Sequence, residues 1–330
     1  MPYRFKLDEK IKRGFRRIAR EQVAKALDEL WATDIPAGAI HASRKAIKRL
    51  RALLRAAAPA LGATVQRRHD KALRDIARRL SLRRDADVTE ETISKLETLY
   101  GSEAVDGLRP LRARLQEKPE GAAEPLDAEA MQAIRTALIE EGKRISQATL
   151  KGRGVTPIIE GIAATYRDGR RALKRAYDTP TDETIHELRK MVQAHWRHMA
   201  LLSRAWPDEM SLRLEAAREL SQMLGDDHDL ALLKQTAASL PIDGAQTIID
   251  LCERRQGELR ATAHPRAVRL YAEQPQYFAQ RITIYWQSGR GLKSKSELAK
   301  PVSPEPGENE GPERGSAIGS PADLAAKTPA

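Results

Sequence analysis

The sequence predicts an all-α protein built from antiparallel helices with short connections, with the helices duplicated in tandem and a disordered tail at the C-terminus. Two observations predict this class. Apolar residues recur at three- and four-residue spacing through almost the whole chain, and no segment shows the convincing alternation of a β-strand. In addition, two short motifs return about 145 residues later, in the same order.

The first half contains five expected helices whose ends are marked by capping or breaking residues. Asp8 is expected to cap the first helix, and the segment 33–38 (TDIPAG) interrupts the chain after it. Pro59 ends the second helix, and Thr89 is expected to cap the fourth. The expected helices span about 8–31, 39–58, 63–82, 89–100 and 103–116, and a linker follows at 117–125.

The second half continues the same pattern. Asp127 is expected to cap its first helix, and Pro157 occupies the first turn of the next, where proline is tolerated. Gly225 is expected to end one helix, and Asp226 or Asp227 to cap the following one. The expected helices span about 127–150, a segment starting at 157, a segment between 181 and 206, and then 208–224, 227–239, 243–263 and 276–288.

The expected organisation is one domain at 1–289, with halves at about 1–118 and 126–289, followed by a tail at 290–330. The tail has six prolines and no aromatic residue, a composition that cannot bury a core and therefore predicts disorder. Its basic and acidic side chains balance at six each, so the whole net charge of +11 belongs to the domain.

The repeated motifs are the most informative feature of the chain. His41-x-x-Arg44-Lys45 returns as His186-x-x-Arg189-Lys190 at an offset of 145 residues. Further along, Leu80-x-x-x-Arg84-Asp85 returns as Leu224-x-x-x-His228-Asp229 at an offset of 144. Two motifs that return at nearly the same offset predict a tandem duplication in which each half presents the same cationic group on a helix.

The first motif helix has one strongly basic face. At about 100° per residue, its polar residues fall within one arc and its apolar residues on the opposite side. Adjacent like charges cost a few tenths of a kcal/mol per pair, so this face is more stable once an anion neutralises it. The alternative is a solvated basic face, which the recurrence in the second half disfavours. The face comprises His41, Arg44, Lys45, Lys48, Arg51 and Arg55.

The second motif helix has a weaker basic face. Gln193 stands where the first copy has Lys48, and His195 projects from the apolar side, where a packed core histidine is expected rather than a ligand. The basic residues on this face are His186, Arg189, Lys190, Arg197 and Arg204.

The composition favours a phosphate-bearing polyanion without bases. Of the 57 basic residues, 39 are arginine, and the pI is near 9.7. The planar guanidinium of arginine binds two phosphate oxygens at once and keeps its charge near neutral pH. Aromatic residues are only 4% of the chain, whereas proteins that bind single-stranded nucleic acid without sequence preference stack bases on aromatic side chains.

The motif pair HxxRKxxKRLR and HxLRKxxxxxW, each copy followed by L-x-x-x-(R/H)-D, resembles the CHAD family, the "conserved histidine α-helical domain". The resemblance covers about residues 1–288. It implies two helical bundles related by a pseudo-twofold axis, with basic residues on a shared central surface. It also implies binding of inorganic polyphosphate and association with polyphosphate granules in bacteria. The chain departs from the pattern at Gln193, Ala194 and Trp196, which leaves equal contributions from the two halves open.

Roles for the candidate residues follow from this expectation. The first-rank polyphosphate ligands are Arg44, Lys45, Lys48, Arg51 and Arg55, and the second-rank ligands are Arg189, Lys190 and Arg197. His41 and His186 either contact phosphate or orient a neighbour. Asp85 and Asp229 are expected to pair with a motif arginine or histidine and to fix its rotamer.

No catalytic, metal or cofactor site is expected. The sequence lacks a P-loop, HExxH and G-x-S-x-G, and the acidic run at 226–229 fits a helix junction better than a metal site. With a single cysteine, Cys252, no signal core and no span of membrane length, the expected location is the cytoplasm, with no membrane partner. The family resemblance adds the granules to this expected location. The oligomeric state is left open.

Two alternatives to non-enzymatic polyphosphate binding stay open at this stage. One is a nucleic-acid or nucleoid-binding protein, which the net charge alone allows. The other is a phosphohydrolase, or an accessory to one, acting on polyphosphate or triphosphate. Competition between polyphosphate and nucleic acid separates the first, and metal-dependent release of phosphate separates the second.

Overall fold

The computed structural model describes residues 3–31, 37–80, 85–116 and 127–298. In these ranges all regular secondary structure is helical, so the predicted all-α fold is confirmed. The helices are α1 (Ile11–Asp28), α2 (Ala37–Ala56), α3 (Ala58–Leu61), α4 (Ala63–Arg79), α5 (Asp85–Tyr100), α6 (Ser102–Gln116), α7 (Ala128–Gln147), α8 (Thr156–Asp178), α9 (Asp182–Leu201), α10 (Pro207–Ser239), α11 (Ala245–Leu270) and α12 (Pro275–Leu298).

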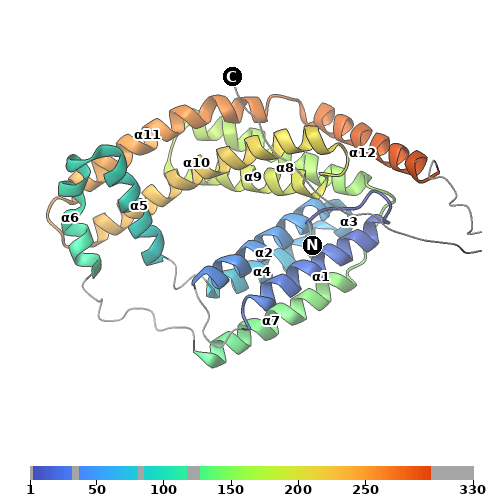
Figure 1. Ribbon diagram of the computed structural model, residues 1–330, viewed down its shortest axis with the longest axis horizontal. Coiled ribbons are helices and arrows are strands. Elements are labelled where there is room, and N and C mark those ends of the chain that lie inside the picture. Colours follow the sequence, from blue (N-terminus) through green and yellow to red (C-terminus); the bar gives the residue numbers. More distant parts are fainter. Residues whose placement is uncertain (1–2, 32–36, 81–84, 117–126, 299–330) are drawn as a thin grey trace, which may run out of the picture.

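The helices pack into two bundles and a smaller group at one end (Figure 1). The N bundle consists of α1, α2, α4 and α7, and the C bundle consists of α8, α9, the first part of α10, and α12. The third group, here called the tip, contains α5, α6, the last part of α10 and the start of α11. The tip has its own apolar core, which includes Leu96, Leu108, Leu233 and Leu251.

This packing crosses the predicted boundary between the halves. Helix α7 follows the boundary in sequence but packs on α1 and α4, whereas α5 and α6 precede it and pack on α10 and α11. The helix bounds nevertheless repeat at the motif offset, because adding 145 to 37–56, the bounds of α2, gives 182–201, the bounds of α9. The pseudo-twofold axis and the halves themselves stay predictions, and the linker at 117–125 lies outside the described residues.

Three of the expected helix starts are confirmed. The Asp127 carboxylate accepts a hydrogen bond from the amide of Ala130 at 2.6 Å and caps α7. Pro157 lies in the first turn of α8. The second motif helix begins as expected after Thr181, whose side chain and that of Thr184 cap each other's backbone amides. Short polar side chains at these ends therefore identified the boundaries correctly.

Three other expected boundaries are wrong. Helix α1 begins after Lys10, and the Asp8 carboxylate instead binds the Lys293 ammonium at 2.5 Å. Helix α5 begins at Asp85, so Thr89 lies inside it. Helix α10 continues without a break through Gly225, although two helices with a cap at 226 or 227 were expected. Packing of this segment against α9 and α11 outweighs the glycine penalty, which is about 1 kcal/mol.

The predicted tail begins too early. Helix α12 continues to Leu298, so residues 290–298 are helical, while 299–330 lie outside the described residues. The first proline after the start of α12 is Pro301. The prediction of disorder rested on the prolines from there onward, and residues 290–298 contain none of them. Near this end, Gly289 packs so closely on the Ala205 carbonyl that a Cβ would lie 2.5 Å from the oxygen.

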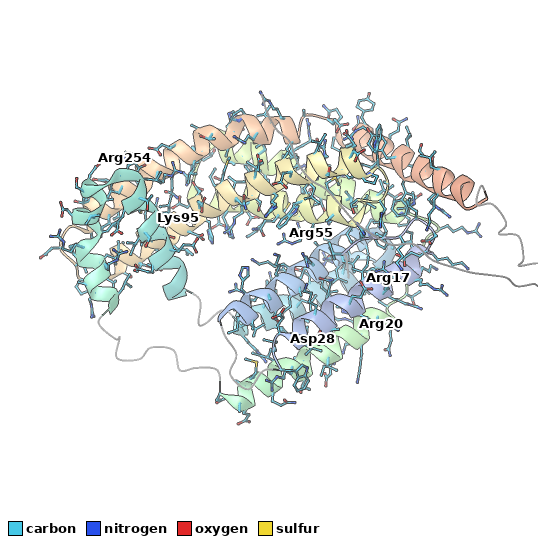
Figure 2. All side chains as sticks on the ribbon, in the orientation of Figure 1. Arg17, Arg20, Asp28, Arg55, Lys95 and Arg254 are labelled. Atoms are coloured by element: carbon cyan, nitrogen blue, oxygen red, sulfur yellow. The ribbon has the colours of Figure 1, made fainter. Side chains whose placement is uncertain are left out.

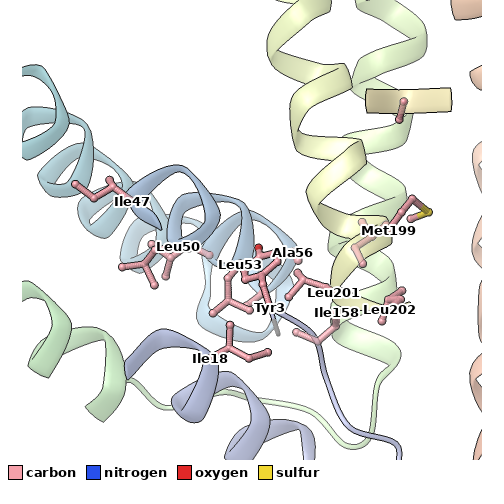
Figure 3. Packing of buried hydrophobic residues seen from close by; sticks show 14 of the residues in the cluster. Tyr3, Ile18, Ile47, Leu50, Leu53, Ala56, Ile158, Met199, Leu201 and Leu202 are labelled. Carbon is pink, nitrogen blue, oxygen red and sulfur yellow. The ribbon is translucent and has the colours of Figure 1, made fainter. Parts of the chain in front are cut away.

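One continuous apolar core joins the two bundles (Figure 3). Ile18 and Leu53 of the N bundle lie against Ile158, Leu201 and Leu202 of the C bundle, and all five are fully or almost fully buried. Burial of side chains of this size stabilises a fold by about 2 kcal/mol each. The two bundles therefore share one apolar core across their junction.

Candidate functional site

The two motif helices, α2 and α9, meet at the junction of the bundles. The buried His198 ring lies 3.0 Å from the Ala52 carbonyl oxygen through its Nε2 atom. Burial lowers the pKa of His198 to about 3, so the ring is neutral and its Nε2–H donates to the carbonyl. This bond fixes α9 against α2 and brings their arginines close to one another.

Arg197 is the most unusual of these arginines, because it is a buried cation. Its side chain is 8% exposed, donates to the Gln193 carbonyl at 2.8 Å and lies over the Trp196 ring at 5.0 Å. Among the described residues no carboxylate pairs with it. Burial and the nearby guanidinium groups of Arg49 and Arg51 lower its pKa to about 10, so it remains charged near neutral pH.

A groove of 990 Å³ opens beside this junction, between α4 on one side and α8 and α9 on the other. The end of α2 supplies Arg55, which lies between the two bundles (Figure 2) and donates to the Met191 sulfur at 3.5 Å. Gly161 lies at the crossing of α8 with α2, where a Cβ would be 2.1 Å from the Ala56 carbonyl oxygen. Five cations line the groove: Arg55, Arg67, Lys71, Arg74 and Arg175.

The charges of the groove do not balance. Three carboxylates also line it, and each pairs with a cation outside that set of five: Asp70 with Arg51 at 2.8 Å, Asp168 with Arg171 at 3.6 Å, and Glu187 with Lys190 at 2.5 Å. By contrast, in the described part of the chain no carboxylate lies within ion-pair distance of any of the five lining cations. The groove therefore carries a positive surplus that only a ligand or counterions neutralise.

The structure places the expected ligands on α2 at different distances from this groove. Arg55 lines it, and Arg51 reaches it through the bidentate pair with Asp70, whose two contacts are 2.8 and 3.1 Å. The other four lie along the earlier turns of α2 and do not line the groove; His41 and Lys45 are exposed, and Arg44 and Lys48 are half-buried.

The expected ligands on α9 lie around a pair of histidines. The His186 ring stacks on the His228 ring of α10 with centroids 4.2 Å apart. Burial, together with Arg189 and Lys190, lowers the pKa of both rings, that of His228 to about 4. Both rings are therefore neutral at pH 7. The Arg189 guanidinium lies against Gly225, where a Cβ would be 3.7 Å away.

The predicted supporting carboxylates are only partly described. The side chain of Asp85 lies outside the described residues, and Asp229 is half-buried on α10, where its expected pairing stays a prediction. The buried acid of this segment is Asp227, which pairs with Arg260 at 2.6 Å, and Arg260 also binds Asp182 at 2.6 Å. This network joins the start of α9 to α10 and α11 and has a structural role.

A family model for the CHAD domain matches residues 17–238, which is two thirds of the chain. The chain belongs to the CHAD family. All residues that line the groove fall within the matched region of this CHAD domain, whereas α11 and α12 follow it. The family expected from the repeated motifs is therefore confirmed.

Among solved structures, the chain is similar to "PptA from Streptomyces chartreusis". The TM-score is 0.54 and the sequence identity 18%, over 77% of this chain and 98% of the other. At this identity the similarity shows the fold alone. No curated protein matches the sequence.

Four cations of the CHAD groove were absent from the expected ligands. Arg67, Lys71 and Arg74 follow a spacing of four and three residues on α4, which places them on one helix face, and this signal was visible in the sequence. Arg175 carries no such signal, because it reaches the groove only through the crossing of α8 over α2 at Gly161.

The described residues form neither a metal-binding cluster nor a membrane-spanning helix. No group of three or more histidine, cysteine, aspartate or glutamate side chains is placed to hold a metal ion. No helix in the described ranges combines the length and the apolar character that crossing a membrane requires.

Proposed function

We propose that this CHAD protein binds inorganic polyphosphate without catalysing a reaction, and that the groove and the adjacent Arg197 form the binding site. The observation that carries the proposal is the set of five groove cations, Arg55, Arg67, Lys71, Arg74 and Arg175, that have no carboxylate partner among the described residues. The carboxylates of the groove pair with other cations, outside this set of five. The groove is therefore suited to an anionic ligand.

The shape and chemistry of the groove support a linear phosphate polymer. Its cations come from three helices: α4 supplies a row of three, and α2 and α8 supply one each. Four of the five are arginines, whose planar guanidinium groups bind phosphate oxygens two at a time. No aromatic side chain lines the groove, so it offers no stacking platform for nucleic-acid bases.

Arg197 gives the site a buried anchor next to Arg51. A buried cation among other cations is costly unless an anion accompanies it. A phosphate near Arg51 and Arg197 would relieve this repulsion, and we assign the first contact of the polymer to this point. The remaining motif cations on α2 then continue the path along the helix.

The decisive experiment is a titration of the purified protein with long-chain polyphosphate, double-stranded DNA and ATP at two salt concentrations. We expect tight binding of polyphosphate that weakens steeply with salt, because the condensed counterions are released on binding. DNA and ATP should bind far more weakly. Equal affinity for DNA would assign the protein to the nucleic-acid class, and no binding of polyphosphate would refute the proposal.

Two further measurements test the remaining parts. A phosphate-release assay with polyphosphate and triphosphate, with and without divalent metal, should give no product if the protein only binds. A fluorescent fusion expressed in a bacterium that accumulates polyphosphate should follow the granules. A fusion that stays dispersed while the purified protein binds polyphosphate would reject granule association alone.

A further inference from the structure

A second hollow, of 670 Å³, lies on the other flank of α8, against the first turn of α12. It is more basic than acidic, since three arginines and one carboxylate line it. Its polar and charged lining consists of Glu160, Arg167, Arg170, Arg171, Gln274 and Gln276. The N-terminal end of α12, a 24-residue helix without acidic residues in its first turn, adds a positive dipole end to the same hollow.

The two hollows adjoin one another across α8. Ala164 lines both of them, and its neighbours Gly161, in the first groove, and Ala163, in the second hollow, are also small. Between the two hollows, α8 therefore presents small side chains at these three positions. A flexible linear polymer that fills the first groove meets no large side chain among these residues on its way to the second.

The arginines of the second hollow differ in how they are held. Arg170 donates to the carbonyls of Tyr271 at 2.5 Å, Ala272 at 3.0 Å and Glu273 at 2.6 Å, so its charge is fixed at the floor of the hollow. Arg167 is exposed and, within the described ranges, pairs with no carboxylate. It is therefore available to a ligand.

We propose that a polyphosphate chain too long for the first groove continues over Ala164 into the second hollow, where Arg167 contacts it. The protein then binds long chains more tightly than short ones because long chains occupy two basic hollows on α8. This inference rests on the proposed function and adds a selection for chain length to it.

The test compares tripolyphosphate with long-chain polyphosphate in the wild type and in Arg167→Glu. We expect the variant to lose about tenfold in affinity for the long chain and about one unit of its salt slope, as for one phosphate contact. Affinity for tripolyphosphate should not change. Arg171 is left intact, because its partner Asp168 lines the first groove and would lose its cation.

The matched control is Arg20→Glu, which makes the same charge change on α1, at an exposed position of the N bundle outside both hollows (Figure 2). It should leave both affinities close to wild type. A second variant, Ala163→Glu, places a carboxylate in the second hollow without removing an arginine and should reproduce the selective loss. Thermal unfolding verifies that each variant is folded.

The outcomes separate this inference from the proposed function. A wild type that binds neither polymer refutes the proposed function. A wild type that binds both polymers equally well, or an Arg167→Glu variant that loses both affinities together or neither, overturns the inference while polyphosphate binding itself stands.

Discussion

The two motif helices have the same length and the same motif but carry their charges differently. Helix α2 holds its basic residues at exposed or half-buried positions. Helix α9 keeps Arg197 buried and stacks His186 on His228. At the 145-residue offset, Arg197 takes the position of Ala52, and Trp196 takes that of Arg51. One copy thus offers a surface for contact, and the other a buried anchor at the junction.

This difference indicates that the repeated motif keeps the positions of its residues more than their roles. A guanidinium at the position of Arg197 is buried because α2 packs against that side of α9, as the His198–Ala52 bond shows. The corresponding side chain in α2 is alanine, so this pair of equivalent positions buries one cation rather than two. We therefore expect α2 to determine most of the affinity, and α9 to determine how the ligand is seated.

The largest expected effect comes from neutralising the basic face of α2. Under the proposed function its four central cations contribute about 1 kcal/mol each to binding, so their loss should weaken polyphosphate binding about a thousandfold. The fold should persist, because the apolar face of the helix is unchanged. The change is Arg44→Gln, Lys45→Gln, Lys48→Gln and Arg51→Gln together, measured by titration and by thermal unfolding.

A quadruple variant on α1 controls for the loss of net charge. Its four cations are exposed, and none lines either hollow: Lys12→Gln, Arg13→Gln, Arg16→Gln and Arg20→Gln. If this control weakens binding as much as the α2 variant does, the contribution is the long-range field of the protein and the contrast between the faces is lost.

The second effect concerns the buried anchor on α9. Arg197→Met removes a buried cation without a carboxylate partner, so the free energy of unfolding should rise by about 2 kcal/mol. Affinity for polyphosphate should fall about tenfold, since one charged contact is worth about 1.4 kcal/mol. Urea denaturation and titration of the same preparation measure both. A variant that is less stable and binds normally would show that Arg197 is structural.

Arg213→Met is the matched control within the C bundle. Arg213 is also largely buried, but it pairs with Glu273 at 3.4 Å and donates to the Leu270 carbonyl at 2.9 Å. Replacing Arg213 with methionine removes both of these interactions, although Glu273 keeps its pair with Arg281 at 2.6 Å, so this variant should be less stable than the wild type. Its affinity for polyphosphate should not change.

The sequence predicted the helices well where local chemistry decided them. Asp127 and Pro157 mark helix starts by capping or by fixing φ, and both positions were correct. Gly225 failed as a helix end because burial against neighbouring helices outweighs its intrinsic preference. Helix α7 packs on α1 and α4, and α5 and α6 pack on α10 and α11. No local sequence signal indicates this packing across the predicted boundary.

The candidate site was predicted in part for the same reason. Repetition and helical spacing identified Arg51 and Arg55, which reach the groove. They could not reveal that Arg197 is buried or that Arg175 crosses into the groove, since both facts depend on how the bundles pack. For a site formed between helices, the packing of the helices determines its position, and the motif does not.

The third effect is a pH dependence that arises at the pair formed by His186 of α9 and His228 of α10. The pKa of His186 is lowered by burial with Lys190 and Arg189, against the opposing charges of Glu187 and Glu183. The pKa of His228 is lowered to about 4 by burial with the same two cations and His186, against Asp182.

A bound polyanion raises both values, so protons are taken up on binding and affinity should increase severalfold as the pH falls from 8 toward 5. His228→Asn should reduce this increase while preserving the affinity at pH 8. Titrations across this range measure it. The same profile in wild type and variant would place the titrating groups elsewhere, including on the ligand.

The smallest effect concerns Asp70, the carboxylate that pairs with Arg51 of α2. Asp70→Asn removes a negative charge from the groove and frees the Arg51 guanidinium for phosphate. This ion pair is partly exposed, and such a pair is worth less than about 1 kcal/mol, so affinity for polyphosphate should rise about threefold. Glu215→Gln is the control, because residue 215 is the equivalent position at the 145-residue offset and its pair with Arg218 lies outside the groove.

The sign of this change decides how the basic face of α2 works. A rise with Asp70→Asn and none with Glu215→Gln would mean that Asp70 competes with the ligand for Arg51. The face would then act as a row of independent charges. A fall would contradict the prediction and would show that the bidentate pair holds Arg51 in its binding orientation. In that case both motif helices would rely on side chains that the fold holds in place. The burial of Arg197 would then be the remaining difference between them.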